Sequence, residues 1–413
     1  MRGLLVGMAC VLVAWSASGQ PAQPVQPPAW PLAESYLLQG RYEAGERDLI
    51  EALAKDPGND QLRFGLGTVQ FVRAHHGLVS ALYAAGLKDQ SQVLGDLLPI
   101  VRLPIPTNDH PQPLSYDALR LILDAWVEQL AKAEATLAQV RDPNVALPIR
   151  VGLIRFTLGA EGEKAPTMTL AQILERLGFA FPSSDPQLYI RFDRADVAWL
   201  RGYCHLLMAL GNFFLAHDSR DLFETTGHLF FAEISTPHEF LTRQQRVFNW
   251  NGTDLMDLIA FIHQLRFEVV EPKRMEAALA HLEKTLALSR ETWRLVLAES
   301  DDDHEWLPSP KQTGILRVPV TQEMVDAWLE MVSEAELILA GKRLVPFWRD
   351  AGGKGVNLRR VFTEPRRFDL VLWLQGTAAT PYLEEGAITR PEIWGRLQQV
   401  FQGRFLGFAV WFN

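Results

Sequence analysis

Apolar side chains recur every three to four residues along most of the chain, which is the spacing of one face of an α-helix. Two of these segments follow a residue that can cap a helix start, Ser115 and Thr321. The predicted long helices cover residues 61–85, 116–140, 191–216, 272–297 and 321–339. Shorter helices are predicted at 93–98, 169–177, 221–231 and 253–267.

The pattern changes after residue 340. Short aromatic-rich runs bounded by Gly, Pro or charged residues occur at 344–348, 356–362 and 368–374, and such runs are typical of strands. The sequence therefore predicts a mainly α fold, an all-helical array with a small β element near the C-terminus that is confined to residues 344–374.

Residues 31–67 predict two short helices and the start of a third. Tyr36 and Leu37 lie on an apolar face, and Gly40 provides the helix stop and the tight turn. The second helix ends at Pro57, and Asp60 is a candidate cap for the helix that follows. The segment is a predicted α-α hairpin.

This stretch resembles a tetratricopeptide repeat (TPR), whose period is about 34 residues. Leu66-Gly67 follows Leu32-Ala33 by one such period, although Gly45 stands where the family usually has Ala, and the likeness ends near residue 67. The resemblance implies α-α hairpins that continue into a helical array with a concave surface for a protein or peptide partner, and it implies no catalytic residues. The matching residues are Leu32-Ala33, Tyr36, Gly40, Tyr42, Ala52-Leu53, Asp56-Pro57 and Asn59.

The first residues have the pattern of a bacterial export signal. Arg2 precedes an apolar run at 4–15, and Ala17-Ser18-Gly19 supplies small residues for cleavage after Gly19. The run is too short to span a bilayer, so we expect a periplasmic or secreted protein without a stable membrane span. Cleavage would leave Cys204 as the only cysteine, so no internal disulfide is expected.

Composition divides the rest of the chain. A Pro-rich linker at 20–31 precedes a TPR-like region (32–140), a helical domain (141–300) and a C-terminal α+β region (301–413). The acidic run at 301–305 is expected to be a solvated linker at the last boundary. The net charge of −9 argues against a nucleic-acid partner.

No intact motif for a cofactor or metal is present. Lys354 follows two glycines but is followed by Gly355 and Val356, so the phosphate-loop motif fails. The histidines are scattered, and adjacent His75 and His76 are interpreted as helix surface. No cofactor and no metal are expected.

Two functions from different classes remain open. The first is a helical-repeat scaffold that binds a protein or peptide in its groove. The alternative is a hydrolase-like enzyme with a site around Asp193, Arg201, His205, His217 and His228. The candidate ligand-binding residues are Arg201, His205, Asn212, His217 and His228.

The helix predicted at 191–216 is the most apolar in the chain. Arg201, His205 and Asn212 form one polar stripe on it. Either Asp196 or another carboxylate satisfies Arg201 and the stripe is structural, or the stripe faces a ligand. Loss of stability on replacing Arg201 separates the two interpretations.

Overall fold

The computed structural model describes residues 29–88, 105–158, 166–176, 188–242, 253–315, 319–349, 352–401 and 408–409. The predicted export signal, most of the Pro-rich linker and the short helix predicted at 93–98 lie outside the described residues.

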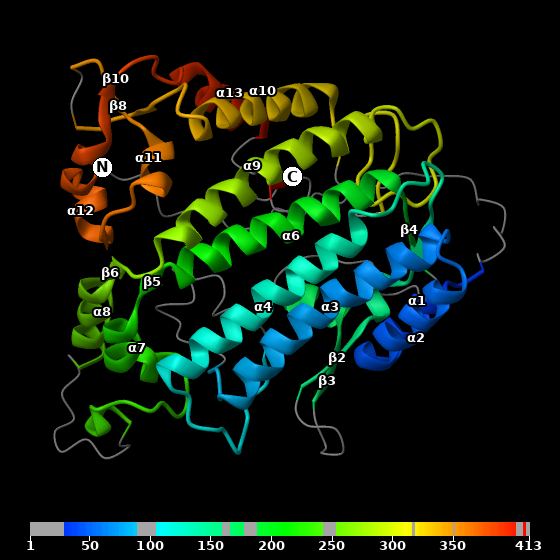
Figure 1. Cartoon of the computed structure of the whole chain (residues 1–413), viewed down its shortest axis with the longest axis horizontal. Coiled ribbons are helices and arrows are strands. Elements are labelled where there is room, and N and C mark those ends of the chain that lie inside the picture. The colour runs from blue at the N-terminus through cyan, green and yellow to red at the C-terminus, as the bar shows by residue number, and fades with distance from the viewer. Residues whose placement is uncertain are drawn as a thin grey trace, which may run out of the picture.

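Long helices lie side by side and form most of the molecule (Figure 1). Along the layer, α4 lies between α3 and α6, and α9 lies between α6 and α10. The predicted long helices are confirmed, with ends shifted by a few residues. The helices are α1 (Leu32–Gln39), α2 (Tyr42–Lys55), α3 (Asp60–Ala84), α4 (Tyr116–Leu137), α6 (Arg194–Leu215), α9 (Pro272–Val296), α10 (Gln322–Leu339) and α13 (Pro391–Phe401).

Short helices and turns cover the two ends of this layer. They include α5 (Leu170–Arg176), α7 (Arg220–Thr226), α8 (Thr253–Gln264), α11 (Leu358–Thr363) and α12 (Leu370–Gln375).

Helix ends follow local chemistry. Gly40 ends α1 with φ 70°, in the left-handed region that favours glycine, as predicted. Ser115 and Thr321 cap α4 and α10, also as predicted. At α3 the predicted cap was wrong: the side chain of Asn59, not Asp60, accepts from the Leu62 amide at 3.0 Å.

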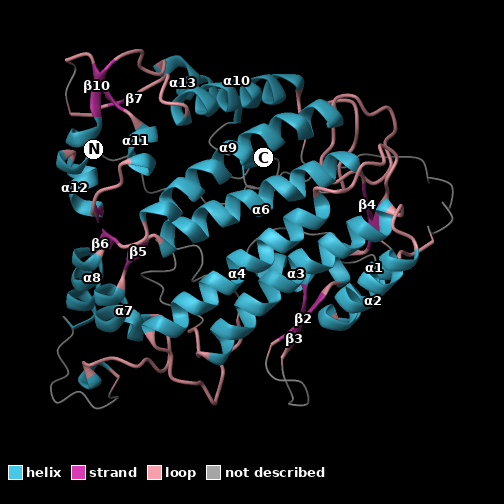
Figure 2. Ribbon diagram, in the orientation of Figure 1, coloured by secondary structure: helices cyan, strands magenta, loops and turns pink. Residues whose placement is uncertain are grey.

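Small antiparallel sheets join helix ends (Figure 2). Two have two strands: β1 (Leu147–Ile149) with β4 (Ile190–Phe192), and β2 (Arg155–Thr157) with β3 (Thr167–Thr169). Two have three: β5 (His217–Asp218), β6 (Arg266–Val269) and β9 (Phe368–Asp369), and β7 (Val345–Pro346), β8 (Lys354–Val356) and β10 (Leu383–Glu385). The mainly α class with a small C-terminal β element is confirmed, but its confinement to 344–374 was wrong.

Two of the predicted strands are largely helices. Residues 358–363 form α11 and residues 370–375 form α12. Each begins at a side-chain cap: Asn357 accepts from the Arg360 amide at 3.4 Å, and Asp369 accepts from the Leu372 amide at 2.9 Å. The first amide groups of a helix have no hydrogen-bond partner within the helix, and a capping side chain supplies one. This gain outweighs a weak preference for a strand.

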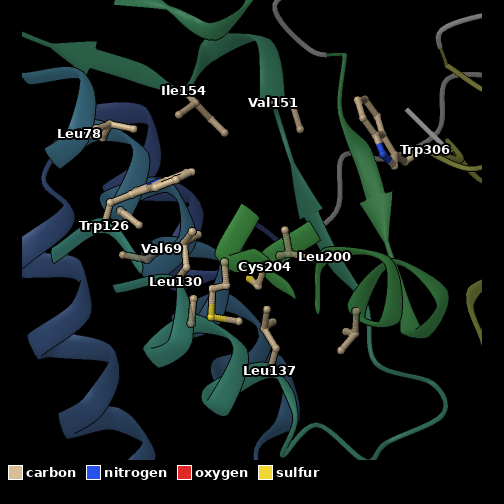
Figure 3. Packing of buried hydrophobic residues seen from close by; sticks show 14 of the residues in the cluster. Val69, Leu78, Trp126, Leu130, Leu137, Val151, Ile154, Leu200, Cys204 and Trp306 are labelled. Atoms are coloured by element: carbon tan, nitrogen blue, oxygen red, sulfur yellow. The ribbon is translucent and has the colours of Figure 1, made fainter. Parts of the chain in front are cut away.

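One cluster of buried apolar side chains runs through the molecule, from Ala33 in α1 to Phe408. It joins residues from all three regions predicted from composition. Figure 3 shows its centre, where α3, α4 and α6 contribute Val69, Leu130 and Cys204. The long helices therefore share a common interior.

We expected the acidic run at 301–305 to be a solvated linker. This expectation was wrong for the end of the run. Glu305 is 5% exposed, and Trp306 and Leu307 after it are buried in the main core. Asp301 and Asp303 pair with Arg191 at 3.7 and 3.3 Å. Burial of Trp306 and Leu307 brings Glu305 inward, while Asp301 and Asp302 stay exposed. No helix in the described part of the chain is both long and apolar enough to cross a bilayer.

Candidate functional site

The polar stripe of α6 faces α4 and α9, the two helices that flank it. Arg201 and His205 lie near the middle of α6 and Asn212 lies toward its end. The structure brings these three candidates into one seam, which we call the α4–α6–α9 seam. It comprises Arg120, Asp124 and Glu134 of α4, Arg201, His205 and Asn212 of α6, and Arg274 and His281 of α9, with Glu271 just before α9.

Glu134 is the centre of one half of the seam. Arg201 donates to Oε1 of Glu134 from Nε at 2.9 Å and from Nη2 at 2.8 Å. Nε2 of His205 lies 3.5 Å from the same oxygen. Burial opposes ionisation of Glu134, but the hydrogen bonds from His205 and Arg201 outweigh it and lower its pKa to about 2. The pair is ionised at neutral pH.

A second histidine closes this half. Nδ1 of His205 and Nδ1 of His281 are 2.9 Å apart, so one ring donates and the other accepts. Burial lowers the pKa of His281, and the neighbouring His205 lowers it further. At least one of the two rings must therefore be neutral, and the lowered pKa of His281 favours the neutral form of that ring.

Arg274 is the centre of the other half. It donates to Asp124 at 2.8 Å, to Glu271 at 2.8 Å and to Asn212 at 3.3 Å. Glu271 also accepts from Arg120 at 2.6 Å. The charges of this half therefore neutralise one another.

The remaining candidates lie elsewhere. His217 is in β5 after α6, where Nδ1 bonds the Phe213 carbonyl at 2.7 Å and burial lowers the pKa of the ring. His228 faces α8, with Nε2 at 3.6 Å from Asp257. Asp193 caps the start of α6. From Asp193 to His217 the chain runs the whole of α6, roughly 35 Å at about 1.5 Å per residue. The five residues of the hydrolase-like alternative do not converge.

Carboxyl groups gather at the start of α6, a feature that the sequence did not identify as a site. Asp193 and Asp196 form a capping box, and Glu299 and Glu305 lie against them. Burial, followed by the charge of Asp193, raises the pKa of Glu299 to about 9. Burial also raises the pKa of Glu305 to about 7.

Glu299 is hydrogen-bonded to Asp193, so a protonated Glu299 shares its proton with that carboxylate. Burial raises the pKa of Asp196 as well, and its Oδ1 has no hydrogen-bond partner among the described residues. We call Asp193, Asp196, Glu299 and Glu305 the carboxyl cluster. Within the described ranges, no three His, Cys, Asp or Glu side chains are arranged to hold a metal ion.

The second arrangement with binding chemistry is the face of α1–α3. Residues 146–157 lie against it, and three of their main-chain carbonyls accept from helix side chains. Gln61 donates to the Ala146 carbonyl at 2.7 Å, the Tyr42 hydroxyl donates to the Arg155 carbonyl, and Nε2 of His76 is 2.7 Å from the Thr157 carbonyl. The interpretation of His76 as helix surface was therefore wrong.

One ion pair anchors this segment. Arg150 donates to both oxygens of Glu34, at 2.6 and 3.2 Å, and stacks over Trp30 at 4.3 Å. Glu34 is 2% exposed. At Gly40 a Cβ would lie 3.1 Å from the Arg155 carbonyl oxygen, so glycine lets the segment approach closely.

Searches of this sequence and structure against protein-family models, curated proteins and solved structures find no match. The geometry above is therefore the basis for a function.

Proposed function

We propose that this chain is a helical-repeat scaffold that binds a protein or peptide partner, and that it works outside the cytoplasm after export. The face of α1–α3 is the recognition surface. It holds a segment by its main chain, and in this structure the chain's own residues 146–157 occupy it, as two short strands joined by a 3-10 turn at Val151–Leu153.

The carbonyl contacts carry the proposal. Gln61, Tyr42 and His76 come from α2 and α3 and bond main-chain oxygens, so they recognise the backbone of the segment whatever its side chains. Peptide-binding surfaces of this kind gain affinity from main-chain bonds and specificity from a few anchors. Glu34 is such an anchor because it is buried and takes a guanidinium in two hydrogen bonds.

The α4–α6–α9 seam supports a scaffold over an enzyme. Its ions are paired with one another, and a general acid or base must instead be free to exchange a proton with substrate. Cys204, the one cysteine after the predicted cleavage, is fully buried, and burial raises the pKa of its thiol. A thiol in this state is not a nucleophile.

A peptide copying residues 146–157 tests the proposal when added to the Arg150→Ala protein. The substitution leaves Glu34 buried without its partner. It therefore weakens the attachment of the chain's own segment, by a free energy of about 3–5 kcal/mol if the pair is fully lost. The added peptide restores the arginine. We expect fluorescence polarisation to show at least about tenfold tighter binding to Arg150→Ala than to the native chain, whose own segment competes at high effective concentration.

The control is the same peptide with alanine at the position of Arg150. It should bind the variant at least about tenfold more weakly than the arginine peptide. Equal binding of the two peptides, or no binding of either, would show that this face does not recognise the 146–157 segment.

A further inference from the structure

Exposed apolar side chains are concentrated where α8 and α12 meet. Ile259 and Ile262 of α8 are 49% and 42% exposed, and Val371 and Leu374 of α12 are 49% and 71% exposed. Trp348 beside them is 51% exposed. We call these five residues the α8–α12 surface. Contiguous exposed apolar side chains of this extent mark an interaction surface.

Hydrogen bonds join the elements that carry these side chains. The Leu370 amide at the start of α12 donates to the Leu265 carbonyl after α8 at 2.9 Å. Nε1 of Trp348 donates to the Leu374 carbonyl at 3.1 Å. In Figures 1 and 2, α8 and α12 lie at one end of the helical layer, and α1 and α2 lie at the other. The surface is therefore separate from the face of α1–α3.

Basic side chains lie beside this surface in an otherwise acidic protein. Residues 342–369 contain eight basic and three acidic side chains, whereas the whole chain has a net charge of −9. Arg349 is exposed beside the end of α12, with its Cγ 3.2 Å from where a Cβ on Gly376 would lie. Arg366 and Arg367 are exposed just before β9 and α12, and Arg367 pairs with the exposed Glu268 at 3.2 Å.

We propose that the α8–α12 surface docks on an anionic lipid bilayer. The isoleucine, valine and leucine side chains enter the boundary between headgroups and acyl chains. Trp348 lies at headgroup depth, which suits tryptophan because its ring is apolar and its N–H edge is polar. Arg349, Arg366 and Arg367 contact lipid phosphates. An apolar surface alone fits many partners, and the basic border selects an anionic one.

This attachment is peripheral. The helices concerned are short, and each also packs inward, through Phe261 of α8 and Trp373 of α12. The exposed side can therefore bind in the interface while the fold stays unchanged. The proposal does not depend on the function proposed for α1–α3. A partner held there and a bilayer contacted here are at opposite ends of the molecule (Figure 1).

Flotation with lipid vesicles tests the proposal on the full chain. We expect binding to vesicles of equal parts phosphatidylglycerol and phosphatidylcholine, and at least about tenfold weaker binding to phosphatidylcholine alone. Salt should weaken the binding because it screens the arginines. No binding to the anionic vesicles, or equal binding to both kinds, overturns the proposal, and the exposed side chains would then belong to a protein contact.

Matched variants locate the contact. Leu374→Asp should reduce flotation about tenfold or more because it removes a leucine that enters the bilayer and adds a negative charge. Leu121→Asp is the control, since Leu121 on α4 is 70% exposed and Leu374 is 71% exposed. Arg349→Glu should reduce flotation, and Arg47→Glu on α2 should not. Circular dichroism verifies that each variant is folded. Equal loss in Leu374→Asp and Leu121→Asp would contradict the assignment.

Discussion

Replacing Arg201 by leucine is expected to lower the free energy of unfolding by about 3 kcal/mol. The side chain of Glu134 is only 16% exposed and that of Arg201 21% exposed, so loss of the guanidinium leaves a carboxylate with little water to replace it. His205 at 3.5 Å is too long a contact to take over both hydrogen bonds. Denaturant unfolding at pH 7 measures the change.

Arg47→Leu is the matched control. Arg47 pairs with Asp48 at 3.0 Å on α2, but its side chain is 65% exposed, and such pairs contribute about 0–1 kcal/mol. The double variant Arg201→Leu, Glu134→Leu should recover part of the loss because it removes both charges. An Arg201→Leu protein as stable as the native chain would mean that the stripe is not structural, and the α4–α6–α9 seam would then be the first place to search for a ligand.

The second large effect is a loss of stability as the pH rises. The pKa values of Glu299 and Glu305 are raised to about 9 and about 7, well above those of an unfolded glutamate. Between about pH 5 and pH 9 the folded state therefore holds protons that the unfolded state has released. Stability falls with pH wherever the folded state binds more protons, by about 1 kcal/mol per pH unit for each such proton. Below about pH 7 the lowered pKa values of His217 and His281 act in the opposite direction, because their folded states bind fewer protons than the unfolded chain. Thermal melts from pH 7 to pH 9, where these histidines are neutral, should show Tm decreasing.

Glu299→Gln identifies the origin of this effect. The amide can donate to Asp193 as the protonated carboxyl does, but it never ionises. The variant should match the native chain at pH 5 and be more stable by about 1 kcal/mol or more at pH 9, a value set low because water reaches part of this side chain and screens its charge. Glu43→Gln is the control because the side chain of Glu43 is 85% exposed. A Tm that stays level from pH 7 to pH 9 would contradict the raised pKa values.

Helical periodicity predicted most of the fold, because a long amphipathic helix repeats its signal over many turns. The short strands were missed for the opposite reason: β1, β2 and β5 have two or three residues each, too few for a pattern. In residues 358–375 aromatic content favoured strands, and the caps at Asn357 and Asp369 favoured helices. The caps decided the outcome.

The site was harder to predict than the fold. The stripe of Arg201, His205 and Asn212 was visible because it repeats along one helix, but Glu134 and Arg274 come from helices far away in sequence. The carboxyl cluster combines two acidic segments about 100 residues apart, and only the capping-box spacing of Asp193 and Asp196 could have been noticed. Residues that act through contacts between distant segments leave no local pattern.

The hydrogen bond from Tyr42 tests most directly whether the face of α1–α3 recognises the main chain of a bound segment. In the Arg150→Ala protein, adding Tyr42→Phe removes only the hydroxyl that bonds the Arg155 carbonyl. We predict that the 146–157 peptide then binds about threefold to tenfold more weakly, the effect of one hydrogen bond. Equal affinity of the peptide for the Arg150→Ala protein with and without Tyr42→Phe would contradict recognition through the main chain and with it the proposed scaffold.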